Sequence, residues 1–99
     1  MGSVLVTVEY QVTSAQTRRF FHAIHEYGRV RRRDGAYRWG VYRDLEKPDR
    51  YVEAFLVSSW AEHLRQHERL TNADRKVEDQ LRTYVTGAPR TRHLVSVDS

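Results

Sequence analysis

The sequence predicts an α+β fold in which four strands and two helices alternate in the order β-α-β-β-α-β. Residues 4–12 alternate apolar and polar side chains with the two-residue period of a half-buried strand. Residues 13–33 and 59–84 carry apolar side chains three and four positions apart, as helices that cover a sheet do. Turn sequences rich in glycine, proline and aspartate separate these stretches, so each is expected to form its own element.

The first strand is followed by a helix that we expect to begin at Thr13 and to end near Arg33. Thr13 and Gln16 have the spacing of a capping box, in which two side chains satisfy backbone N–H groups of the first turn. Asp34-Gly35 ends the helix, since glycine readily adopts the left-handed conformation found at helix C-termini. The apolar stripe of this helix comprises Phe20, Phe21, Ile24, Tyr27 and Val30.

Residues 36–43 and 51–58 are expected to pair as a hairpin around the turn Lys47-Pro48-Asp49. The middle of the strand over residues 51–58 is apolar on both faces, which indicates that helices cover one face and another sheet covers the other. In the strand over residues 36–43, the alternation predicts one face with Tyr37, Trp39 and Val41 and an opposite face with Arg38, Gly40 and Tyr42.

The second helix is expected to begin after Ser59, which forms a second capping box with Glu62. It breaks or bends near Thr71-Asn72 and resumes toward Tyr84, and residues 92–97 form a short last strand. This order is the ferredoxin-like pattern, βαββαβ, and we expect one domain over residues 1–99. Residues 1–3 are either a native start or a cloning remnant.

A four-stranded sheet with both helices on one face leaves its other face bare. A chain of 99 residues buries only roughly 60–65% of its unfolded surface, so a second copy is a natural cover for that face. We therefore expect a homodimer in which two sheets pack back to back as a dimeric α+β barrel. Its small-molecule cavity would lie between each sheet and its own helices.

Composition excludes several classes of function. The chain has no cysteine, which excludes disulfides, thiolate metal sites and a cysteine nucleophile and favours a cytoplasmic location. Neither an apolar run of about 18 residues nor a signal-peptide pattern is present, so no membrane partner is expected. The net charge of +4 and the arginines at 29 and 31–33 fit the end of a helix, where the macrodipole favours cations. Nucleic acid is therefore not an expected partner.

The stretch SSWAEHLRQHERLT, residues 58–71, carries the candidate site. At helical spacing Trp60, His63, Leu64 and His67 share a stripe that must face the sheet, with His67 the more inward histidine. One interpretation is a core anchor with a hydrogen-bonded core histidine. The other is a cavity wall in which His67 accepts or donates a proton near neutral pH. His63 and His67 could also hold a metal, but no third ligand stands at a diagnostic spacing, so no metal site is expected.

Other side chains are candidates for the same cavity. Trp39, Phe21 and Ile24 are expected as walls for a flat apolar molecule, and Tyr37, Arg38 or His63 would orient its polar edge. Glu53, in an otherwise apolar strand, could be a general base, an ion-pair partner or a solvent-facing residue at the barrel's end. The sequence contains no dinucleotide, P-loop, nucleophile-elbow or metalloprotease motif. The chemistry must then come from the substrate itself, with proton handling by histidine or tyrosine, or from a cofactor that has no sequence signature. No cofactor is expected.

Three runs carry a resemblance to a known family: RRRDGAYRWGVYRD (31–44), LEKPDRYVEAF (45–55) and SSWAEHLRQHERLTNADR (58–75). Together they resemble the soluble C-terminal segment of major-facilitator exporters, the group that includes enterobactin-exporter-like proteins. That segment is in turn similar to the antibiotic-biosynthesis-monooxygenase superfamily of dimeric α+β barrels. The transmembrane helices of the exporters have no counterpart in these runs.

The resemblance implies two functions. A freestanding barrel would act as a cofactor-independent monooxygenase or cyclase on an aromatic or polyketide-like molecule, using Trp60 and His67. The asparagine that haem-degrading relatives carry on their first strand has no match here, which argues against haem. Alternatively, the chain is the non-catalytic cytoplasmic domain of an exporter, serving in ligand sensing or dimerisation.

Overall fold

The computed structural model describes residues 2–68 and 70–98, apart from the side chains of Gln66 and His67. Its elements are β1 (Val4–Gln11), a 3₁₀ turn η1 (Ser14–Gln16), α1 (Thr17–Arg33), β2 (Tyr37–Arg43), β3 (Arg50–Val57), α2 (Trp60–Glu68), α3 (Asn72–Arg82) and β4 (Arg90–Val95). The expected element order is confirmed. The expected second helix is divided into α2 and α3 at the predicted break, and the last strand begins and ends two residues earlier than expected.

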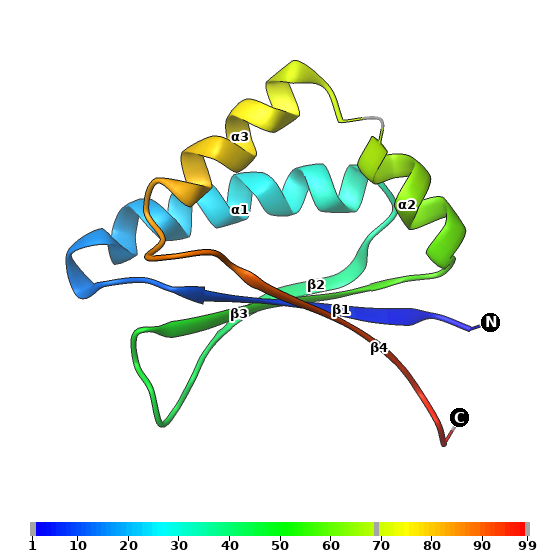
Figure 1. Ribbon diagram of the computed structural model, residues 1–99, viewed down its shortest axis with the longest axis horizontal. Helices are drawn as coiled ribbons and strands as arrows, with labels where there is room; N and C mark the ends of the chain where they lie inside the picture. The colour runs from blue at the N-terminus through cyan, green and yellow to red at the C-terminus, as the bar shows by residue number, and fades with distance from the viewer. Residues whose placement is uncertain (1, 69, 99) are drawn as a thin grey trace.

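The four strands form one sheet in the order β2-β3-β1-β4, and every neighbouring pair is antiparallel. Figure 1 shows the three helices on one face of this sheet. Helix α3 packs at an angle against α1, and α2 lies apart from them, near the N-terminal end of β1. This is the ferredoxin-like fold. The layer between sheet and helices is where a ligand cavity of this fold can form.

The alternation of β1 decides where the core lies. Val4, Val6, Val8 and Tyr10 are all buried on the helix side, and the residues between them are half-buried. They pack against the apolar stripe of α1, in which Phe20 and Ile24 are fully buried. From β3, Phe55 completes the centre of this core. The apolar face of β1 and the apolar stripe of α1 therefore pack together in one layer.

Strand β2 departs from simple alternation at a β-bulge. Tyr37 pairs with Leu56 and Gly40 pairs with Ala54, so β2 contains one residue more than β3 between these two pairs. Arg38 takes up the extra residue with a φ of 52°, an uncommon conformation for a side chain other than glycine. The bulge shifts Tyr37 to the face that carries Leu56, away from the helices. The prediction that Tyr37 shares a face with Val41 is wrong for this reason.

The helix starts differ from one another. The expected capping box at Thr13 is absent: its side chain makes no capping hydrogen bond, and the chain enters α1 through η1 instead. At α2 the Ser59 hydroxyl accepts from the Glu62 backbone N–H at 3.2 Å, as expected. A full capping box stands at α3, where Thr71 and Asp74 exchange side-chain and backbone hydrogen bonds. Gly35 closes α1 with a φ of 106°.

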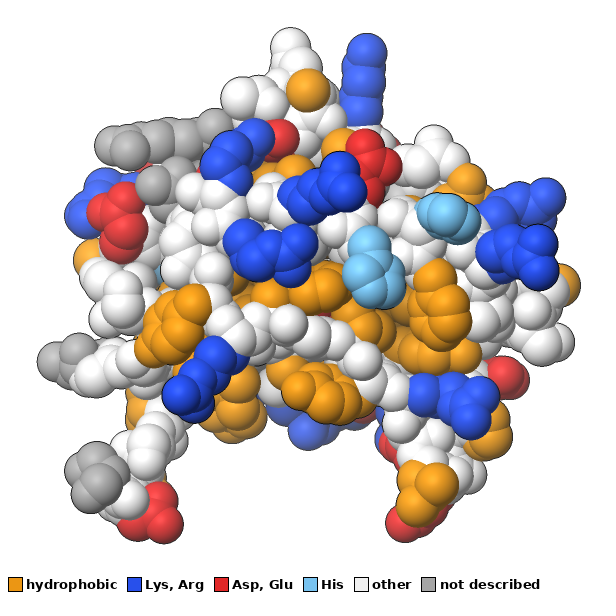
Figure 2. All heavy atoms as spheres, turned by 180° about the vertical axis from the view of Figure 1, so that it is seen from behind, with side chains coloured by type: hydrophobic (Ala, Val, Ile, Leu, Met, Phe, Trp, Pro, Cys, Tyr) orange, Lys and Arg blue, Asp and Glu red, His pale blue; other side chains and the backbone are white. Residues whose placement is uncertain are grey.

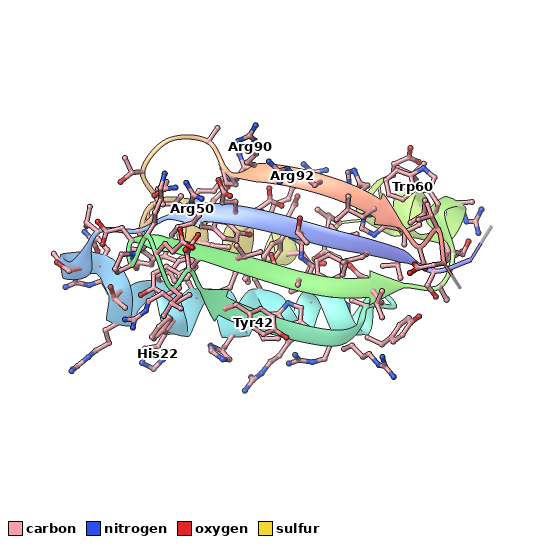
Figure 3. The ribbon with its side chains drawn as sticks, turned by 90° about the horizontal axis from the view of Figure 1, so that it is seen from below. His22, Tyr42, Arg50, Trp60, Arg90 and Arg92 are labelled. Atoms are coloured by element: carbon pink, nitrogen blue, oxygen red, sulfur yellow. The ribbon has the colours of Figure 1, made fainter. Side chains whose placement is uncertain are left out.

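The sheet face opposite the helices is uncovered (Figure 3). Leu5, Val52 and Leu56 lie half-buried on its two central strands, β1 and β3. Arg92 and Tyr42 are exposed toward its two edges, on β4 and β2 (Figure 3). Among the described residues, no helix has the length and apolar character that a bilayer crossing requires.

Candidate functional site

An inner cavity of about 400 Å³ lies between the sheet and the helices. Its floor is Val6, Val8 and Tyr10 of β1, and its roof is formed by side chains of all three helices, among them Arg31, Trp60 and Leu81. Thr91 and His93 of β4 form one side, where the strand is exposed along its whole length and the cavity meets solvent. The volume is within the range of small-molecule sites.

An aromatic and imidazole cluster lines this cavity. The Trp60 ring lies 5.4 Å from the His63 ring and 4.6 Å from the His93 ring, between ring centroids. The two imidazoles are 6.3 Å apart, and Phe55 lies 6.3 Å from His63. Trp60 and His63 come together because they stand three residues apart on α2, and His93 meets them because β4 pairs with β1 at Val6.

His93 is the site residue that sequence reasoning missed. It stands at an alternate position of a strand whose partners Val4, Val6 and Val8 all face the helices. The register of β4 on β1, which places His93 opposite Val6, depends on long-range strand pairing that a single sequence does not display. Two-residue alternation puts His93 on the same face as Val95, and this shared face is the signal that could have indicated it.

Beneath the cavity, Glu53 is the centre of a buried hydrogen-bond network. Its side chain is fully buried, and its two oxygens accept from Tyr10 Oη at 2.9 Å and from Trp39 Nε1 at 2.8 Å. Arg31 adds two bonds, from Nε at 3.0 Å and from Nη2 at 3.1 Å. Of the three roles considered for Glu53, the geometry is that of an ion-pair partner, because a carboxylate with four donors has little capacity left as a base.

Burial and this network shift the pKa values of Tyr10, Tyr27 and Arg31. Burial raises the pKa of Tyr10 far above its ordinary value, and the negative charge of Glu53 raises it further. Burial likewise raises the pKa of Tyr27, against the opposing effect of Arg31, and the Tyr27 hydroxyl donates to Glu78 at 3.1 Å. For Arg31, burial would lower the pKa, but attraction to Glu53 outweighs it and the pKa rises. Both tyrosines therefore remain neutral and Arg31 remains charged.

An outer groove lies on the far side of α1, between that helix and β2, with Phe21, His25, Trp39, Val41 and Tyr51 among its lining residues. Figure 2 looks onto this side and shows hydrophobic side chains surrounded by basic and histidine side chains. The Trp39 indole lies against the backbone of Gly28 and reaches Glu53 with its N–H. Phe21 is 41% exposed and packs edge-on against Tyr51.

The structure thus divides the predicted site residues into groups. Trp60, His63 and Leu64 line the inner cavity together, whereas Trp39 and Phe21 line the outer groove. Ile24 is fully buried in the core and reaches neither. His67 belongs to α2, one turn after His63, but its side chain lies outside the described part of the structure.

Tyr37 and Arg38 also lie away from the inner cavity. The Tyr37 hydroxyl is 2.6 Å from Ser3 Oγ at the edge of the sheet, and Arg38 is exposed on the bulge. Within the described residues, no group of three histidine, aspartate or glutamate side chains could hold a metal ion.

A family model described as a transmembrane secretion effector matches residues 1–99. Comparison with functionally curated proteins gives no match.

Solved structures resemble the whole chain. A protein from Bordetella bronchiseptica described as an antibiotic biosynthesis monooxygenase has a TM-score of 0.82 at 14% identity, over 98% of this chain and 99% of the other. SnoaB, a cofactor-independent oxygenase from Streptomyces nogalater, has a TM-score of 0.81 at 15% identity, over 100% and 97%. Rv0793 from Mycobacterium tuberculosis has a TM-score of 0.77 at 12% identity, over 98% and 97%. At these identities the likeness establishes a shared fold.

Proposed function

The chain belongs to the transmembrane secretion effector family, and from that premise we propose that its inner cavity binds a flat hydrophobic molecule, aromatic or polyketide-like, and acts on it as a cofactor-independent tailoring enzyme. The single observation that carries this proposal is the cluster of Trp60, His63 and His93 at a cavity of about 400 Å³. The indole offers a flat apolar wall, and an imidazole is the side chain that most often accepts or donates protons in enzyme sites.

The chemistry that such a site supports begins with removal of a proton. A neutral imidazole takes a proton from an acidic methylene or phenol of the substrate, which leaves an electron-rich carbanion or phenolate. That anion passes an electron to dioxygen, and recombination forms a carbon–oxygen bond as a peroxide. Loss of water then converts the CH₂ group to C=O, so one oxygen atom enters the substrate and the other leaves as water with the two substrate hydrogens.

The fold shared with SnoaB, described as a cofactor-independent oxygenase, supports oxygenation as the reaction. A cyclase would use the same imidazole to polarise a carbonyl or enol, and it would consume no oxygen. Oxygen uptake therefore separates the two reactions.

The test uses an anthrone, a tricyclic ketone with an acidic methylene, and follows oxygen uptake and quinone absorbance with and without a chelator. We expect the protein to accelerate the reaction in either case. His63→Ala and His93→Ala are each expected to lower the rate at least tenfold, in line with the contribution of general base catalysis. His67→Ala tests the histidine that the sequence favours. His22→Ala, on the outer surface of α1, is the matched control. A wild-type rate equal to that of buffer, with the ligand bound, would rule out oxygenation of this substrate.

The family match supports one alternative, a non-catalytic domain of an exporter that senses the same class of molecule. A sensing domain would bind the aromatic ligand, with His63 and His93 affecting affinity, but it would turn nothing over. Saturable binding without product from any of a panel of anthrones and enolisable polyketides would favour this alternative.

The homodimer is part of the same proposal. The uncovered face of the sheet carries Leu5, Val52 and Leu56, and a copy of the same face offers matching apolar surface. Packing two such sheets would stabilise the floor of each inner cavity from below.

A further inference from the structure

We propose that Arg31 selects the ligand of the inner cavity, favouring flat molecules that carry an acceptor oxygen, as a carbonyl, phenolate or carboxylate. This inference rests on the proposed function, since it names the class of molecule that the same cavity takes. It gives a role to a residue of the RRRDGA run that the charge pattern alone explains as the end of a helix.

The geometry of Arg31 leaves one edge of its guanidinium available. Nε and Nη2 donate to the two oxygens of Glu53, which fixes that side of the group. The guanidinium carbon lies 4.3 Å from the centre of the Tyr27 ring and 4.8 Å from that of Phe55, so aromatic rings pack against its faces. A guanidinium has five N–H donors, and Glu53 takes two of them. The three remaining donors, on Nη1 and Nη2, have no acceptor among the described residues.

The position of the available edge follows from what covers the rest of the guanidinium. Arg31 lines the inner cavity of about 400 Å³ and also a hollow of about 30 Å³ that is too small for an aromatic ligand, and its side chain is 16% exposed. Because Glu53 covers one edge and two rings pack against the group, the edge that ends in Nη1 is the part left to reach a ligand in the inner cavity. A rigid fork held in this way loses little side-chain entropy when it binds an oxygen.

The Arg31–Glu53 ion pair presents hydrogen-bond donors to the inner cavity but no acceptor. Glu53 balances the charge of Arg31, but it is fully buried beneath the guanidinium and does not line the cavity. The other charged pair on the lining, Glu78 and Arg82, is joined at 3.2 Å, and Glu78 also accepts from Tyr27. An oxygen of the ligand near Arg31 therefore gains hydrogen bonds from a charged donor, whereas a cationic group there would lose its hydration without finding an acceptor on Arg31.

Three naphthalenes that differ in one substituent test the selection on the wild-type chain by calorimetry: 2-naphthoate, 2-methylnaphthalene and 2-(aminomethyl)naphthalene. We expect 2-naphthoate to bind at least tenfold more tightly than 2-methylnaphthalene, the size of one hydrogen bond to a charged group. The ammonium ligand should bind most weakly. This series needs no variant, so it does not depend on how well any substitution folds.

Variants with opposite expected effects locate the selection at Arg31. Glu53→Gln removes the countercharge and should increase the preference for 2-naphthoate. The double variant Arg31→Met/Glu53→Gln should abolish the preference and still bind 2-methylnaphthalene. Arg32→Met is the matched control, because Arg32 lies over the outer face of Trp39 and does not line the cavity. Circular dichroism checks that each variant is folded.

The outcomes separate this inference from the function on which it rests. Equal affinity for the three ligands in the wild type, or a preference that survives in the double variant, would overturn the role of Arg31 and leave the cavity as a ligand site. Absence of binding for all three would overturn both proposals.

Discussion

Glu53 occupies a position of β3 where the strand pattern favours a hydrophobic side chain, and its carboxylate is fully buried. A buried charge is tolerated only when its hydrogen bonds are satisfied, and here Tyr10, Arg31 and Trp39 supply four of them. The network joins β1, α1, β2 and β3 at a single carboxylate. We expect it to hold Arg31 at the inner cavity and Trp39 at the outer groove in fixed orientations.

Tyr10 gives the network a measurable pH dependence. Burial raises the pKa of Tyr10 above its ordinary value near 10, so the tyrosine stays protonated in the fold while it ionises in the unfolded chain. Above pH 10 the unfolded state then binds fewer protons than the folded state, and the free energy of unfolding falls with rising pH. Below pH 10 this contribution is complete. Tyr10→Phe should reduce the slope between pH 10 and 11 by up to about 1.4 kcal/mol per pH unit. Urea unfolding at several pH values measures it, and equal slopes would contradict the account.

Gly28 is required by the indole that packs on it. A Cβ at this position would lie 2.6 Å from Trp39 Cζ2 and 2.7 Å from Cε2, so Gly28→Ala must displace the ring and weaken its bond to Glu53. We expect a cost of about 1–3 kcal/mol in the free energy of unfolding, typical of overpacking. In a Trp39→Leu background the same substitution should cost clearly less. Additive costs in this double-mutant cycle would show that the ring is not the cause.

At the scale of elements, the periodic patterns predicted every strand and helix, and the exceptions have local causes. The alternation of residues 36–43 could not reveal the bulge, because the sequence contains no glycine at Arg38 to mark its positive φ. Tyr37 was therefore expected on the wrong face. Thr13 fits the capping pattern in the sequence, but its side chain forms no cap because the chain enters α1 through a 3₁₀ turn.

The two threonine caps make a matched pair for experiment. Thr71 accepts from the Asp74 backbone N–H at 3.1 Å, whereas Thr13 makes no side-chain capping bond. Thr71→Ala should lower the free energy of unfolding by about 1 kcal/mol, the usual contribution of an N-cap, and Thr13→Ala by much less. Denaturant unfolding of both variants tests this. Equal losses would mean that Thr71 contributes through packing and not through its cap.

At the scale of the whole molecule, the sequence predicted the layers but not the assembly of the site. Trp60 and His63 could be found because they share one helix, and local spacing is readable. His93, Glu53 and Arg31 reach the same region only through strand register and long-range packing, which a single chain does not display. Trp39 was expected beside Trp60, but α1 separates the outer groove from the inner cavity.

The uncovered sheet predicts self-association. Ala54 pairs with Thr7 at the centre of that face, so Ala54→Arg would place a charge in the middle of a sheet-to-sheet interface. We expect the wild type to sediment as a dimer and Ala54→Arg as a monomer. Ala15→Arg, at an exposed position of η1, should remain a dimer. A wild type that sediments as a monomer at micromolar concentration would contradict the assembly.

We expect ligands to enter the inner cavity and not the outer groove. Backbone amide NMR of the chain titrated with 2-naphthoate tests it most directly, because the two sites lie on opposite sides of α1. The largest shift changes are expected on α2 around His63, on β4 around His93 and at Arg31. Changes confined to Phe21, Trp39 and Val41 would contradict it.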